Sequence, residues 1–123
     1  MKNPFNIKTM AKENRSFRRV VETGKYGQLV VMSVRKGEDI GEEVHSTTDQ
    51  LFYVVDGKGE LRMDGKMYPL DEHFVMLVPA GTRHDIRNTG TEDLKLFTMY
   101  APPMHREGLV VETRGEALAG AKH

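Results

Sequence analysis

Hydrophobic and polar residues alternate along most of this chain in short runs, with the period of two that is typical of β-strands. The runs are rich in Val, Phe, Tyr, Leu and Met, and turn residues bound them at close intervals. The pattern predicts strands at 16–22, 28–34, 51–55, 60–63, 74–78, 84–87 and 94–100. The pair Asp64-Gly65 predicts a tight hairpin of type I′. Only the Ala-rich segment 116–121 suggests a helix, and it could equally fray.

Many short strands joined by turns predict an all-β fold, either a sandwich or a barrel whose closure removes exposed edges. The 123 residues suit one domain over 1–123, with a short N-terminal arm at roughly 1–15 and a C-terminal tail at roughly 106–123. The strands at 16–34 could extend the sheet of a second copy, so we expect a homodimer.

Charge and cysteine content narrow the possible functions. Lys and Arg number 18, as do Asp and Glu, so the formal net charge is zero and we expect neither nucleic acid nor membrane as a partner. The chain has no cysteine, which excludes disulfides, thiolate metal ligands and cysteine nucleophiles. The N-terminus does not resemble a signal peptide, and the apolar run 74–78 is too short to span a bilayer, so we expect a soluble, cytoplasmic protein.

Four polar residues in two distant segments form a candidate metal site. Glu43 and His45 are two residues apart and would share one face of an extended strand, which also favours Glu43 over Glu42. Gln50 opens the next predicted strand, and His84 follows the turn at 79–81. One carboxylate, one amide oxygen and two imidazoles suit a divalent ion such as Zn, Mn, Fe or Ni.

These residues fall in a pattern that resembles the two motifs of the cupin superfamily. The first motif corresponds to Gly37, Glu43-x-His45, Gln50 and Gly57, and the second to His73, Pro79-Ala80-Gly81, His84 and Asn88. The resemblance implies a single-domain jelly-roll β-barrel, often a homodimer, with a metal ion near its mouth. It implies His45 and His84 as histidine ligands. Glu43 stands where another histidine is usual, and Gln50 stands where a glutamate is usual.

These departures preserve the charge of the ligand set, because one carboxylate remains among four ligands. Gln50 could bind the ion directly or hydrogen-bond its surroundings. His73 replaces a turn glycine, which predicts a turn without a positive backbone angle. We expect Asn88 to tie down a turn and the remaining histidines to lie on the surface, namely His73, His105 and His123.

Three hypotheses for function follow. The first is a metal-dependent enzyme acting on an oxygen-rich small molecule, either as a sugar isomerase or epimerase or as a dioxygenase. No second carboxylate presents itself as a general base, which weakens the isomerase variant, and no catalytic residue is assigned. The second is a binding module for a sugar or carboxylate without turnover, and the third is a metal-free structural barrel.

Overall fold

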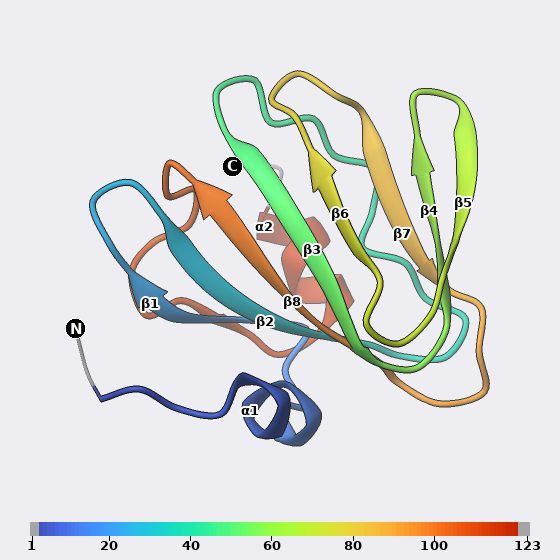
Figure 1. Cartoon of the computed structure of the whole chain (residues 1–123), viewed down its shortest axis with the longest axis horizontal. Coiled ribbons are helices and arrows are strands. Elements are labelled where there is room, and N and C mark those ends of the chain that lie inside the picture. The colour runs from blue at the N-terminus through green and yellow to red at the C-terminus, as the bar shows by residue number, and fades with distance from the viewer. Residues whose placement is uncertain (1–2, 121–123) are drawn as a thin grey trace.

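The computed structural model describes residues 3–120, which form two antiparallel β-sheets and two short helices (Figure 1). The strands are β1 (Arg18–Thr23), β2 (Gln28–Val34), β3 (Asp49–Asp56), β4 (Gly59–Met63), β5 (Lys66–Leu70), β6 (Val75–Val78), β7 (His84–Asn88), β8 (Leu94–Ala101) and β9 (Val110–Val111). The helices are α1 (Ile7–Glu13) and α2 (Arg114–Gly120). Neither of these helices is long and apolar enough to cross a bilayer.

The larger sheet has the strand order β6-β3-β8-β2-β1-β9, and the smaller has the order β5-β4-β7. The predicted all-β class is confirmed, but the closed barrel is wrong, because the two sheets remain separate over the described residues. The free edge of β7 is instead covered by an irregular segment, through isolated bridges at Asp39 and Glu43. The predicted free edge at 16–34 is wrong too, since β1 pairs with both β2 and β9.

The core lies between the two sheets, where alternate residues of each strand point inward. The larger sheet contributes residues such as Phe52 and Leu96, and the smaller contributes Leu61 and Ile86. These four side chains are at most 2% exposed. The period of two in the sequence therefore reflects burial of one face of each strand.

The predicted N-terminal arm is partly helical. Asn6 caps α1 by accepting a hydrogen bond from the Thr9 amide at 3.0 Å. Ala11 is fully buried and packs with Val31 and Val55 on the outer face of the larger sheet. The strands β5 and β9 were also not predicted. In the tail, α2 agrees with the helix suggested at 116–121, whose residue 121 lies outside the described residues.

Two turns test the expectations for backbone angles. Asp64 and Gly65 have φ of 51° and 76°, as the predicted type I′ hairpin requires. His73 has φ of 70°, so the expectation of a turn without a positive angle is wrong. Contacts hold His73 in this conformation, because its amide donates to the Val54 carbonyl and its Nδ1 lies 2.8 Å from the Tyr53 hydroxyl.

The prediction that Asn88 ties down a turn is confirmed. Its Nδ2 donates to the carbonyl oxygens of Val34 and Glu92, at 2.9 and 2.8 Å. Its Oδ1 accepts from the Gly90 amide at 2.9 Å. Asn88 thereby joins the end of β2 to the turn that follows β7.

Candidate metal centre

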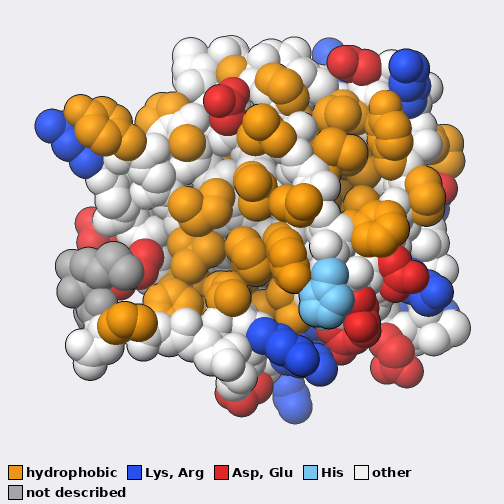
Figure 2. Space-filling view, viewed as in Figure 1, with side chains coloured by type: hydrophobic (Ala, Val, Ile, Leu, Met, Phe, Trp, Pro, Cys, Tyr) orange, Lys and Arg blue, Asp and Glu red, His pale blue; other side chains and the backbone are white. Residues whose placement is uncertain are grey.

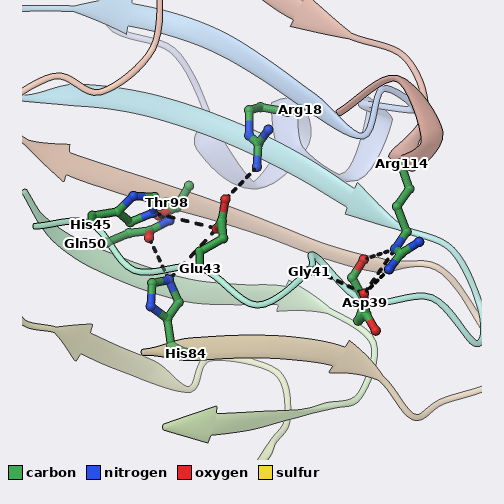
Figure 3. A network of polar contacts seen from close by, with 9 residues as sticks. All are labelled: Arg18, Asp39, Gly41, Glu43, His45, Gln50, His84, Thr98 and Arg114. Atoms are coloured by element: carbon green, nitrogen blue, oxygen red, sulfur yellow. Dashed lines mark hydrogen bonds and ion pairs between the residues drawn. The ribbon is translucent and has the colours of Figure 1, made fainter. Parts of the chain in front are cut away.

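Three separate segments bring the candidate ligands together (Figure 3). Glu43 and His45 lie on the irregular segment between β2 and β3, where the Glu43 amide donates to the His84 carbonyl and the His84 amide donates back. The Gly81 amide donates to the His45 carbonyl at 2.7 Å. Gln50 lies on β3, and His84 is the first residue of β7. These backbone bonds fix the segment with Glu43 and His45 against the strand that carries His84.

One potential ligand atom from each of Glu43, His45 and His84 lies within 4.8 Å of the other two. Glu43 Oε1 is 3.7 Å from His45 Nε2 and 4.0 Å from His84 Nε2. Gln50 Oε1 lies 3.2 Å from the same His84 nitrogen. All four predicted residues therefore converge, while Glu42 points away and pairs with Arg83 at 2.7 Å. Glu43 and His45 face the same point, as expected, although their segment is irregular and is not a strand, whereas binding of an ion by these residues stays a prediction.

The hydrogen bonds of His84 determine which of its nitrogens is free. Its Nδ1 lies 2.9 Å from the Thr82 carbonyl and must donate to it. Burial lowers the pKa of His84, which favours the neutral ring with an acceptor lone pair on Nε2. That lone pair faces Gln50 Oε1. The amide nitrogen of Gln50 donates to the Thr98 hydroxyl, which identifies Oε1 as the atom that faces His84. Two acceptors thus face each other, an arrangement that a cation between them would stabilise.

Glu43 and His45 add further acceptors without donors. Glu43 Oε1 and both ring nitrogens of His45 are buried and have no hydrogen-bond partner among the described residues. Burial alone would raise the pKa of Glu43, but the adjacent His45 and the Arg18 guanidinium outweigh it and lower that pKa. Glu43 is therefore ionised at neutral pH. Unpaired buried acceptors are unfavourable, so this donor set fits a divalent transition-metal ion.

A cavity of about 440 Å³ adjoins the centre and is lined by Glu43, His45, Arg18 and His105. Arg18 Nη2 lies 3.6 Å from Glu43 Oε2, so Glu43 stands between Arg18 and the histidines (Figure 3). The prediction that His105 lies on the surface is wrong, because its Nε2 is buried and its ring packs edge-on against Tyr100.

His73 lies away from this centre. His73 is exposed as predicted, and His123 lies outside the described residues. No motif marks Arg18 or His105, and only the fold brings them to the cavity.

The chain matches the Cupin domain family over residues 30–100, and it belongs to the cupin family. It is 40% identical over 124 residues to the uncharacterized protein YrkC of Bacillus subtilis, covering 94% of this chain and 67% of that protein. The crystal structure of BH2720 from Bacillus halodurans superposes with a TM-score of 0.95 at 40% identity, covering 97% of this chain and 95% of that one.

A shorter match concerns an enzyme of stated activity. Over 65 residues the chain is 38% identical to quercetin 2,3-dioxygenase of Bacillus subtilis, covering 53% of this chain but 19% of that enzyme. The similarity supports a shared cupin module. It leaves the reaction of this chain to be inferred from its own site.

Proposed function

We propose that this protein binds one divalent metal ion, Zn, Mn, Fe or Ni, through Glu43, His45, His84 and Gln50, and acts there on an oxygen-rich small molecule. The observation that carries the proposal is the convergence of unpaired buried acceptors on one point. A bound ion would polarise a carbonyl or enediol oxygen of the substrate, and iron would also support chemistry with dioxygen.

The chain's own residues define how a substrate meets this centre. His84 is held by Thr82, and Gln50 by Thr98, so both side chains are fixed before anything binds. The adjoining cavity gives a small molecule access to Glu43 and His45. Preorganised groups of this kind favour binding, because little order is lost when the ligand arrives.

The acidic residues around the cavity favour dioxygenase-like chemistry over isomerisation. Glu43 and Glu42 are the carboxylates among its described lining residues. Glu43 belongs to the proposed ligand set, and Glu42 is paired with Arg83. Neither is free to abstract a proton from carbon, as an isomerase requires. Because the cavity lacks a free carboxylate among its described lining residues, a non-catalytic binding module remains the second candidate.

Oxygen consumption distinguishes these functions. We would load the protein with iron or with manganese and measure dioxygen uptake with flavonols, catechols and 2-keto acids, alongside ligand-induced changes in melting temperature. Uptake that requires iron and is lost in a His45→Ala, His84→Ala variant supports the enzyme. Stabilisation by a ligand without turnover supports the binding module. If metal-loaded protein shows neither turnover nor stabilisation, both candidates fail.

We also propose a homodimer formed by the outer face of the larger sheet, where hydrophobic side chains gather (Figure 2). Two apolar rows run in register across β2, β8, β3 and β6: Leu29, Met99, Leu51 and Leu77, then Val31, Phe97, Tyr53 and Val75. Helix α1 packs over one end, against Val31, but Val75 and Leu77 remain 57% and 54% exposed. An uncharged apolar face of this kind is typical of interfaces between identical subunits.

Light scattering tests the dimer. The wild type should have twice the chain mass of 14.0 kDa. Leu77→Glu should restore the monomer, because a charge would be buried within the interface. Met67→Glu is the control, since Met67 on β5 is also 54% exposed but lies on the other sheet. A monomeric wild type at high concentration would contradict the dimer.

A further inference from the structure

The cavity beside the candidate metal centre has a polar wall and an apolar wall. The polar wall consists of Arg18, Glu42, Glu43, His45 and His105. The apolar wall comes from β9, α2 and the loop before β9, and consists of Leu109, Val111, Ala117 and Leu118. A ligand that fills this space would meet charge on one side and hydrocarbon on the other.

Arg18 is a buried cation with unused hydrogen-bonding capacity. Its side chain is 8% exposed, and its Nη2 contacts Glu43 Oε2 at 3.6 Å, which is longer than a hydrogen bond. Its Nε is buried and has no partner among the described residues. A guanidinium offers donors in a fixed planar fork that matches a carboxylate, so the free Nε indicates a missing anionic partner.

The metal centre would strengthen this requirement. Glu43 is the anion that faces Arg18, but its other oxygen points at the histidines and belongs to the proposed ligand set. With a divalent ion bound, the charges of the ion, Glu43 and Arg18 sum to plus two, and the charge of Glu42, the other lining carboxylate, is balanced by its ion pair with Arg83. Burial of such an excess is unfavourable unless an anion enters.

His105 lies on the same cavity and is fixed by an unusual clamp. Gln28 on β2 accepts hydrogen bonds from the Met104 and His105 amides, at 3.1 and 2.9 Å, and donates to the His105 carbonyl at 2.7 Å. Burial and the nearby Arg18 charge lower the pKa of His105 to about 4, so the ring is neutral at physiological pH. Its buried Nε2 has no hydrogen-bond partner among the described residues.

We propose that this cavity binds a small organic carboxylate, which pairs with Arg18 and contacts His105 while its hydrocarbon part packs against the apolar wall. The inference rests on the proposed metal centre, because the ion's charge makes an anion necessary. It narrows the ligand from an oxygen-rich molecule to an anionic one. Neutral sugars would leave Arg18 Nε and the excess charge without a partner.

Calorimetric titration of metal-loaded protein with matched ligands tests the proposal. Benzoate and hexanoate are the carboxylates, and benzamide and hexanamide are their neutral counterparts of similar shape. The carboxylates should bind about tenfold or more tightly than the amides, because a charge-assisted pair is stronger than a neutral hydrogen bond. Equal affinity of acid and amide would overturn the proposal.

Two variants assign the effect to the cavity. Arg18→Met should weaken carboxylate binding about tenfold or more without weakening amide binding, whereas Arg19→Met, on the exposed face of the same strand, should change neither. If Arg18→Met does not fold, His105→Leu provides the test and should selectively weaken the carboxylates. Unchanged carboxylate affinity in a folded Arg18→Met variant would refute the assignment.

Metal analysis of the same samples separates the two proposals. If the wild type binds no metal, the proposed function itself is refuted. If the wild type has its full metal content but does not prefer carboxylates over amides, only the inference of a carboxylate ligand is refuted. Arg18→Met should retain the metal, because Arg18 is not a ligand.

Discussion

Replacing Gln50 with glutamate would test whether its carbonyl oxygen points into the metal centre. Gln50 is 1% exposed, and both its Oε1 and Glu43 Oε1 lie within 4.0 Å of His84 Nε2. The introduced carboxylate would therefore stand at most about 7 Å from Glu43 Oε1, and at an effective dielectric constant near 20 the repulsion costs about 2 kcal/mol or more. The metal-free variant should lose about this much stability.

When metal is present, Gln50→Glu should instead stabilise the protein, because the new negative charge then faces a cation. For a chain of this length the unfolding entropy is about 0.26 kcal/mol/K, so the metal-free melting temperature should fall by roughly 8 °C or more. The upward shift caused by a fixed metal concentration should grow by about 5 °C for each tenfold gain in affinity.

Scanning calorimetry of chelator-treated protein, with and without added metal, provides both numbers. Gln28→Glu is the matched control, since Gln28 is also 1% exposed but hydrogen-bonds to the loop at Met104 and His105. The control should lose stability without a larger metal shift. If Gln50→Glu leaves both the metal-free melting temperature and the metal shift unchanged, Gln50 does not face the ion.

Three further perturbations test the fold around the site. Gly57→Ala should lower the free energy of unfolding in urea by about 2 kcal/mol or more, because Gly57 has φ of 96° and a Cβ would lie 2.9 Å from the Asp93 carbonyl oxygen. Gly37→Ala is the control and should cost about 1 kcal/mol, because Gly37 has φ of 79° but no atom close to the added Cβ. Equal losses in the two variants would contradict the close-approach argument. Lys95→Met should loosen the attachment of α1, because Lys95 Nζ donates to the Asn14 carbonyl and to Ser33 Oγ. Amide hydrogen exchange should become faster at 7–13 and not in β3. Unchanged exchange at 7–13 would show that Lys95 does not hold the helix in place. His105 has a pKa of about 4 in the fold, below its ordinary value of about 6.5, so the unfolded chain binds more protons and stability falls as pH drops from about 6.5 to about 4. His105→Gln should remove up to about 3 kcal/mol of this acid sensitivity, and an unchanged profile of stability against pH would contradict burial of the ring.

Features with local causes were predictable from the sequence. Strand β2 has the predicted bounds 28–34, because its inward residues are apolar and turns flank it. The same-face placement of Glu43 and His45 followed from strand parity alone. The approach of His84 to them follows from backbone pairing between segments about 40 residues apart, and the turn at 79–81 and the resemblance to a family motif indicated it.

Features that depend on tertiary context were not predictable. Strand β5 is an edge strand with mostly exposed residues, so it lacks the alternating pattern. Helix α1 is too short to show a clear apolar stripe, and burial of Ala11 on the sheet stabilises it. His105 reaches the cavity because Gln28 clamps its loop, a contact across 77 residues. The prediction of a closed barrel was wrong because the edge strand β7 is covered by the irregular segment with Asp39 and Glu43, and the two sheets do not join.

Metal content tests the central claim most directly. We would measure it by elemental analysis on protein purified without a histidine tag, in the wild type, in His45→Ala, His84→Ala, and in His73→Ala as an exposed control. The account predicts about one divalent ion per chain in the wild type and in the control, and none in the double variant. A wild type that binds none of Zn, Mn, Fe or Ni when supplied with each, or a double variant that keeps its ion, would contradict it.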